Sequence, residues 1–138
     1  MTGTNTDETI SQEKYVSVAT FRKTGVAVAT ATWIVPLDGG RVGILTSSAS
    51  GKAKRLRNNP SVTLQPSDVR GRVKAGTTPV TGTVELVTSG PAFETITSRV
   101  KAKYGLMVPI MRRVDSLRHL RKGAFPYADT GVVITPQD

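Results

Sequence analysis

GVAVATATWIVPLDGGRVGILTSSASGKAKRLRNNP, residues 25–60, places a strand, a turn, a second strand, a polar loop and a short helix in direct succession. The side chains of Gly25–Val35 alternate between two faces, which is the pattern of a strand. One face carries Val26, Val28, Thr30, Thr32 and Ile34, and the other carries Ala27, Ala29, Ala31 and Trp33. Pro36–Gly40 predicts a turn, so Arg41–Thr46 is expected to return as the second strand of a hairpin. Lys52–Asn58 is predicted to be a helix, which Pro60 stops.

The rest of the chain continues in short strands with helices inserted between them. Further strands are predicted at Tyr15–Phe21, Ser61–Gln65, Pro79–Thr88 and Gly131–Thr135. A helix is expected after Ser89-Gly90-Pro91, with Phe93, Ile96, Val100 and Tyr104 at helical spacing, and a second, basic one at Leu106–Lys122. Many short strands in series favour a small, mainly β barrel over a βαβ sheet. We expect one domain, residues 14–138, after a flexible N-terminal tail at residues 1–13.

The composition excludes several classes of protein. The chain has 138 residues and no cysteine, which excludes disulfides, thiolate nucleophiles and cysteine-ligated zinc. No apolar run approaches the roughly 20 residues that a membrane span needs. The N-terminal segment is polar and carries Asp7, Glu8 and Glu13, which is the reverse of a secretion signal. We therefore expect a cytoplasmic protein without a membrane partner.

The net charge is +9, and the basic residues are concentrated in two segments. Between Gly51 and Lys74 there are seven basic residues and one acid, and between Arg99 and Lys122 there are eight basic residues and one acid. Such clusters attract nucleic acid, an acidic membrane or a charged small molecule, although a solvated face that aids solubility gives the same pattern. Aromatic residues make up only 5% of the chain, and the sequence has neither a helix-turn-helix pattern nor a zinc motif. We expect no nucleic-acid partner.

The stretch from Thr46 to Arg55 has the features of an anion-binding site. A strand end leads here into a helix start, whose free N–H groups and dipole favour a negative ligand. Gly51 allows a ligand to come close. The candidate donors are the hydroxyls of Ser47, Ser48 and Ser50 and the ammonium of Lys52.

The helical periodicity of this stretch leaves two interpretations open. Lys52 and Arg55 share one face of the helix, while Ala53 and Leu56 point toward the core. The alternative to an anion site is an ordinary serine N-cap followed by a solvated basic helix. The stretch is not a P-loop, because no glycine stands five positions before Gly51 and Ala53 occupies the place of the serine or threonine.

Groups for catalysis by the protein itself are scarce. The single histidine, His119, is interpreted as a surface residue of a basic helix. The lack of cysteine and of a convincing acidic pair disfavours a Ser-His-Asp hydrolase or a glycosidase. We predict no catalytic side chain and no metal ligand, so that any reactivity comes from a bound cofactor. Trp33 is a candidate for stacking on a ring system, or else a core or dimer contact.

The order of these motifs resembles the pyridoxamine 5′-phosphate oxidase-like, FMN-binding split β-barrel superfamily. The likeness covers most of residues 14–135 and includes Val28–Trp33, the Asp38-Gly39-Gly40 turn, Leu45-Thr46 and Val80–Val84. Its specific parts are SGKAKRLRNNP (residues 50–60) and KYVSVATFR (residues 14–22), which are most similar to the actinobacterial branch of F420-dependent oxidoreductases. The resemblance implies a homodimeric split β-barrel with its cofactor at the subunit interface.

The resemblance also implies which residues hold the cofactor. In FMN-binding members, a threonine at the strand end and a Ser-Arg-Lys triplet bind the phosphate. Thr46 and Ser50-Gly51-Lys52 take those places here, so glycine stands where the family has arginine. The lost arginine weakens the case for FMN and favours the deazaflavin coenzyme F420, whose phosphate carries a poly-glutamate tail. Lys54, Arg55 and Arg57 are placed to follow that tail.

Two further parts of the site are implied by the family. The strand that corresponds to Val28–Trp33 lies along the ring system, which nominates Thr30, Thr32 and Trp33 as cofactor contacts. The second basic cluster, Arg99–Lys122, is expected to complete the site from the partner chain. The implied function is hydride transfer between reduced F420 and a small organic substrate. The alternatives are an FMN-binding oxidoreductase and a non-catalytic F420 carrier.

Overall fold

The structure is a computed structural model that describes residues 10–105 and 129–137. In this part of the chain, seven strands form one antiparallel sheet, and two α-helices and a short 3₁₀ turn connect them. The strands are β1 (Tyr15–Phe21), β2 (Ala27–Thr32), β3 (Val35–Pro36), β4 (Val42–Thr46), β5 (Ser61–Ser67), β6 (Val80–Val87) and β7 (Thr130–Pro136). The helical elements are η1 (Asp38–Gly40), α2 (Gly51–Asn58) and α3 (Gly90–Lys103). The mainly β fold with short helices is confirmed.

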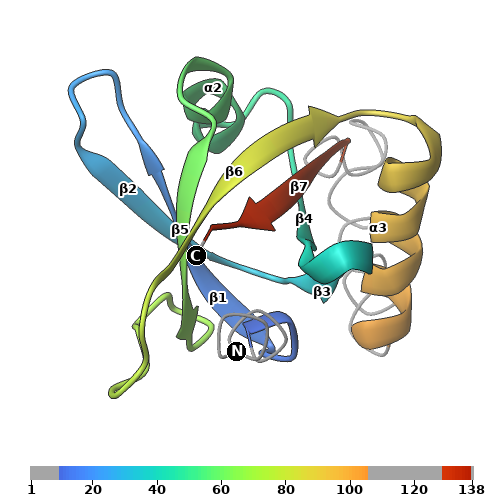
Figure 1. Cartoon of the computed structure of the whole chain (residues 1–138), viewed down its shortest axis with the longest axis horizontal. Coiled ribbons are helices and arrows are strands. Elements are labelled where there is room, and N and C mark those ends of the chain that lie inside the picture. Colours follow the sequence, from blue (N-terminus) through green and yellow to red (C-terminus); the bar gives the residue numbers. More distant parts are fainter. Residues whose placement is uncertain (1–9, 106–128, 138) are drawn as a thin grey trace, which may run out of the picture.

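The sheet is a split barrel, as the connection between its two edge strands requires. The strand order is β2-β1-β5-β6-β7-β4-β3, so β2 and β3 lie at opposite edges. Only Trp33 and Ile34 join these two strands. The sheet must therefore curl until its edges meet at this point, while β2 and β3 remain unpaired with each other (Figure 1).

The long strand predicted at Gly25–Val35 is divided in the structure. β2 pairs with β1, and only the short β3 returns along β4 as the predicted hairpin does. The division occurs at Ile34, whose side chain is fully buried. Its N–H group is bound by the hydroxyl of Tyr104 at 3.1 Å rather than by a neighbouring strand. Period-two alternation did not reveal this break, because it continues unchanged through residues 26–34.

Two apolar clusters lie on the two faces of the sheet. The barrel interior is filled from β1, β4, β5, β6 and β7 and by Leu56 of α2, and it includes Val16, Val18, Leu64 and Ile134. The outer cluster lies beneath α3, where Ile96 and Val100 cover Val133 and Val35. Gly43 permits this close packing, since a Cβ atom there would lie 2.8 Å from the side chain of Ile96. In Figure 1, α3 lies along one side of the barrel and α2 lies at another end of it.

Most of the other predicted elements agree with the structure. β1 has the predicted bounds, and α2, β5, β6, α3 and β7 differ from their predicted ranges by a few residues at most. Ala53 and Leu56 of α2 are buried, as their helical spacing predicted. The predicted basic helix at Leu106–Lys122, with His119, lies outside the described residues.

The segment just before β1 packs against the domain. Residues 1–13 were expected to form a flexible tail, but Ile10 is only 2% exposed and belongs to the interior cluster. Glu13 forms an ion pair with Lys74, with 2.8 Å between the carboxylate oxygen and the ammonium. The packed part of the described chain therefore includes Ile10, and residue 14 is too late a boundary for it. Neither described helix has the length and apolar character that would carry it through a lipid bilayer.

Candidate functional site

The loop between β4 and α2 is built around Ser50, which caps the helix. Its Oγ accepts a hydrogen bond from the N–H of Ala53 at 3.0 Å and donates one to the carbonyl of Ser47 at 2.7 Å. The hydroxyl of Thr46, buried at the end of β4, lies 3.2 Å from the same Oγ. Through these contacts Ser50 serves as the N-cap of α2. The N-cap was one of the two interpretations of this stretch of sequence. Thr46 and Ser50 shape the loop.

The hydroxyl and N–H group of Ser48 are bound by a carboxylate from a distant part of the chain. Asp129, just before β7, accepts from the Ser48 N–H at 2.7 Å and from the Ser48 hydroxyl at 2.8 Å. These donors hold the pKa of Asp129 below its ordinary value. The Ser47 hydroxyl accepts from the N–H of Ala49. Sequence reasoning missed Asp129, since no local pattern connects it to the loop.

The carboxylate at Ser48 also indicates what this loop can bind. An N–H group and a hydroxyl that together hold a carboxylate are donors of the kind that hold phosphate oxygens. Asp129 therefore occupies the Ser48 hydroxyl, which was a predicted donor, together with the N–H group of the same residue. The donors that remain for a ligand are the Ser47 hydroxyl, which only accepts in its contact with Ala49, and the groups at the start of α2.

Lys52 stands at the first turn of α2 and has no partner among the residues that the structure describes. Its side chain is partly buried, and burial together with the nearby Arg55 lowers the pKa of its ammonium. Within residues 10–105 and 129–137, no hydrogen bond or ion pair is made by this ammonium. An anion placed here would relieve both the desolvation and the repulsion. Lys52 is thus the side chain whose surroundings most favour a negative ligand.

Arg55 is held by a neutral group rather than by an acid. Its Nε donates a 2.7 Å hydrogen bond to the hydroxyl of Thr20, which is fully buried on β1. The guanidinium lies over the start of α2, because its Nη1 is 2.8 Å from the position that a Cβ of Gly51 would have. The charge of Arg55 therefore remains available beside Lys52. Sequence reasoning had treated Thr20 only as a strand residue and did not associate it with the site.

The predicted ring contacts lie on another part of the sheet. Thr30 and Thr32 are on β2, where pairing with Val18 and Val16 puts them on the inner face of the barrel. Trp33 is stacked on Tyr104, with ring centroids 4.3 Å apart and planes 6° from parallel. One face of the indole is therefore covered by the protein. This agrees with the interpretation of Trp33 as a core contact rather than as a stacking partner of the cofactor. Within the described residues, no hydrogen bond joins these three residues to the segment Thr46–Arg55.

The chemistry of the α2 site fits a phosphate group. The first N–H groups of a helix have no partner within it, and the side chain of Ser50 accepts only from the N–H of Ala53 here. The N–H groups of Gly51 and Lys52, the Lys52 ammonium and the Arg55 guanidinium are all donors, as a phosphate requires. No cluster of three metal-ligating side chains occurs in the described part of the chain. The arrangement can bind an anion but has no acid–base pair for chemistry of its own.

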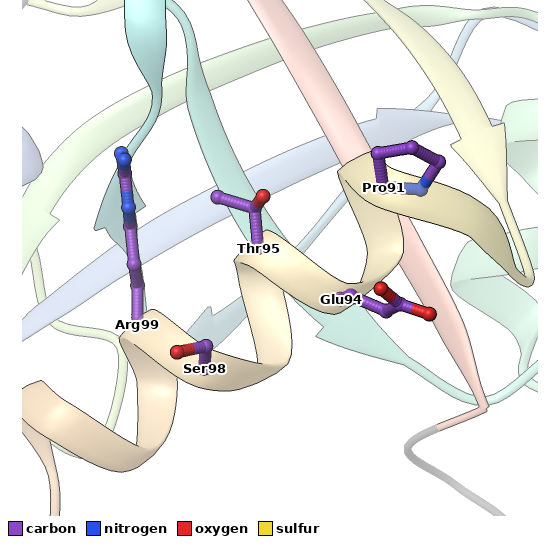
Figure 2. Close-up of a pocket in the computed structure, with 5 residues that line it drawn as sticks. All are labelled: Pro91, Glu94, Thr95, Ser98 and Arg99. Carbon is purple, nitrogen blue, oxygen red and sulfur yellow. The ribbon is translucent and has the colours of Figure 1, made fainter.

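A shallow hollow on α3 is a weaker candidate. It is lined by Pro91, Glu94, Thr95, Ser98 and Arg99, which all come from one helix (Figure 2). The guanidinium of Arg99 already donates to the carbonyl of Pro36 at 2.8 Å. The hollow mixes an acid with a base and brings together no groups from separate elements. It therefore lacks the convergent polar groups of a binding site.

One family model and several solved structures of the same fold match the chain. The family model for pyridoxamine 5′-phosphate oxidase matches residues 4–124. A conserved hypothetical protein from Mycobacterium tuberculosis has a similar structure, with a TM-score of 0.68 and 20% identity over 100% of this chain and 82% of its own. A structure described as an F420 reductase has a TM-score of 0.58 and 19% identity, covering 95% of this chain and 93% of its own.

A third similar structure is that of an FMN-binding protein. It is a pyridoxamine 5′-phosphate oxidase-related, FMN-binding protein from Nostoc punctiforme, with a TM-score of 0.55 and 12% identity, covering 97% of this chain and 76% of its own. At these identities, the three structures establish the fold. No curated protein sequence matches the chain.

Proposed function

The chain belongs to the pyridoxamine 5′-phosphate oxidase family, and from that premise we propose that it is an oxidoreductase dependent on coenzyme F420, with the α2 site holding the cofactor's phosphate. The family binds flavin-type cofactors, and the fold occurs both in an F420 reductase and in an FMN-binding protein. The observation that carries the proposal is the partly buried ammonium of Lys52, which has no partner in the described part of the chain.

The residues of α2 have separate roles in this proposal. The N–H groups of Gly51 and Lys52, with the Lys52 ammonium, bind the phosphate, and Arg55 adds a guanidinium from the next turn. Thr46, Ser47 and Ser50 hold the loop in the shape that presents these donors. The bound cofactor supplies the hydride chemistry, and the protein contributes binding and orientation.

The choice of F420 over FMN rests on the charges that continue along α2. Lys54 and Arg57 are exposed, and Arg57 donates to the carbonyl of Ser48 at 3.1 Å. A phosphate that continues into a poly-glutamate tail gains from such charges beyond the phosphate itself, whereas FMN ends at its phosphate. Thr30 and Thr32 on β2 remain our candidates for contact with the ring system.

We test the cofactor by titrating the purified protein in parallel with F420 and with FMN. The expected result is saturable binding of both, with the tighter binding for F420. Stoichiometric FMN in the purified protein together with no binding of F420 would contradict the proposed cofactor. To separate an enzyme from a carrier, reduced F420 is then offered with a panel of small organic acceptors. Tight binding without oxidation of the cofactor by any acceptor would favour the carrier.

We also propose that the protein is a homodimer. Ala27 and Ala29 of β2 are exposed, and their partners on β1, Phe21 and Ala19, lie on the same outer face of the sheet. α3 covers the opposite part of the sheet, around β3, β4 and β7. A face whose small and apolar side chains are at least partly exposed in the described part of the chain is well suited to a second copy. Light scattering at micromolar concentration should give twice the chain mass, and a monomer would contradict this.

A further inference from the structure

The start of α2 contains an arrangement that the family resemblance does not explain. Gly51 occupies the first turn of a regular helix, where most residues are tolerated, and it is not among the glycines with positive φ. Its backbone conformation therefore does not require glycine. The space beside it is occupied, because an added Cβ would lie 2.8 Å from Nη1 of Arg55 and 3.6 Å from its Cζ and would make the guanidinium shift. The guanidinium rests against the bare α-carbon of Gly51.

Arg55 is kept in this position from its other side. Its Nε donates to the hydroxyl of Thr20 at 2.7 Å, and the same hydroxyl lies 3.5 Å from the carbonyl of Val28. The guanidinium is therefore fixed between β1 and the first turn of α2. None of its neighbours in these contacts is an acid, so the charge is oriented without being neutralised.

We infer that Gly51 and Thr20 are positioning residues that direct the guanidinium of Arg55 to the phosphate of the bound cofactor. Gly51 leaves the space that the guanidinium needs, and Thr20 holds its Nε. Arg55, one helical turn after Gly51, thus supplies the guanidinium that binds the phosphate. The inference rests on the proposed function, since it concerns the same site. It replaces the expectation that glycine is present to let the ligand itself come close.

Gly51 either leaves space for the guanidinium of Arg55 or lets the ligand itself come close, and a double-mutant cycle distinguishes these two explanations. We would titrate F420, with FMN as a second probe, into the wild type, Gly51→Ala, Arg55→Ala and the double variant. Losing the guanidinium should weaken F420 binding about tenfold, and displacing it with the methyl group that Gly51→Ala adds should weaken binding about three- to tenfold. The double variant should bind no more weakly than Arg55→Ala alone. Independent, multiplying losses would mean that the methyl group obstructs the ligand, and they would overturn the inference.

The stability of Gly51→Ala separates positioning from a structural role. The clashing atom is the far end of a flexible side chain, and alanine is the better helix former. The melting midpoint of this variant should therefore equal or exceed that of the wild type while its affinity falls. A lower midpoint with unchanged affinity would show that Gly51 serves only the fold.

Thr20 is tested by a matched pair of substitutions. Thr20→Val keeps the shape of the buried side chain but removes the acceptor for Arg55, and about a threefold or greater loss of F420 affinity is expected. Thr20→Ser keeps the hydroxyl and should bind nearly as the wild type does. Equal affinities for the two variants would overturn the role of Thr20. If the wild type bound neither F420 nor FMN, the proposed function itself would be refuted. That result is visible in the wild type alone, so it is distinguishable from a failure of the double-mutant cycle.

Discussion

Arg99 and Lys103 of α3 differ from Lys52 and Arg55 of α2 in the partners that hold their charges. On α3, Arg99 donates to the carbonyl of Pro36, and the ammonium of Lys103 donates to the carbonyls of Ser11, Glu13 and Ile34 at 2.6–2.8 Å. On α2, Lys52 has no partner in the described residues, and Arg55 is held only by a neutral hydroxyl.

This contrast explains why charge counting alone does not locate the site. Both helices belong to basic segments of the sequence, yet the α3 cations named above stabilise the packing of the N-terminal segment and the bend between β2 and β3. Lys52 and Arg55 of α2 lie near one another, and no acid in the described part of the chain neutralises them. A charge that the fold does not use is the better indicator of a ligand.

The largest expected effect is on the free energy of unfolding, and it comes from Tyr104 at the end of α3. Tyr104 is 3% exposed, stacks on Trp33, and its hydroxyl donates to the carbonyl of Lys14 at 2.8 Å. Tyr104→Ala should reduce the free energy of unfolding by about 3–5 kcal/mol, measured by denaturant titration. Tyr104→Phe keeps the ring and should lose about 1–3 kcal/mol, because the N–H of Ile34 then lacks its acceptor. A Tyr104→Phe variant as stable as the wild type would refute this role of the hydroxyl.

A smaller effect is expected from the ammonium on the same helix. Lys103→Met keeps much of the aliphatic chain but removes three charged hydrogen bonds to carbonyls. Because the side chain is partly open to water, we expect a loss of about 1–2 kcal/mol in the free energy of unfolding. The F420 affinity of the variant should stay within about twofold of the wild type. A marked loss of affinity at unchanged stability would place α3 in the binding site and remove the contrast between the helices.

The smallest effect concerns the carboxylate that holds Ser48. The pKa of Asp129 lies below its ordinary 3.8, chiefly because the Ser48 N–H and hydroxyl bind the charged form. Its stabilising contribution is therefore complete above pH 3.8 and is lost as the pH falls through the lowered folded-state value. Asp129→Asn should show a weaker acid dependence of the melting midpoint below pH 3.8. It should also bind F420 about two- to fivefold more tightly near neutral pH, because one negative charge is removed from the phosphate site.

Asp68 provides the matched control for Asp129. Its pKa is also lowered, chiefly by the N–H group of Arg72, but it lies in the loop between β5 and β6. Asp68→Asn should change the acid dependence of stability without changing the affinity for F420. Tighter binding in both variants would indicate a general effect of net charge rather than a specific one at Ser48.

The sequence predicted the features that depend on local patterns. Alternation and turn residues located most strands, and the spacing of Ala53 and Leu56 gave the buried face of α2. The break at Ile34 could not be predicted, because it depends on a hydroxyl 70 positions along the chain. The packed position of Ile10 likewise depends on contacts with the barrel interior, which a polar composition does not reveal.

The same limit applies to the candidate site. The stretch Thr46–Arg55 was recognisable because a strand end, serines, a glycine and a lysine follow one another directly. Thr20 and Asp129 reach it from β1 and from the start of β7, and no periodicity within the chain connects them to α2. The sequence left open whether Ser50 caps the helix or is a free donor for a ligand. Only the hydrogen-bond geometry identifies it as the cap.

The most direct measurement compares the F420 affinity of two lysine variants, one on each helix. Lys52→Ala removes the unpartnered ammonium and should weaken binding about ten- to hundredfold, equivalent to roughly 1.5–3 kcal/mol. Its melting midpoint should be unchanged or higher, because burial and Arg55 disfavour the charge in the free protein. Lys101→Ala, an exposed position on α3, should bind F420 as the wild type does, so we no longer expect this part of the cluster Arg99–Lys122 to contribute to the site. Unchanged affinity in Lys52→Ala, or a loss in Lys101→Ala alone, would contradict a phosphate site at the start of α2.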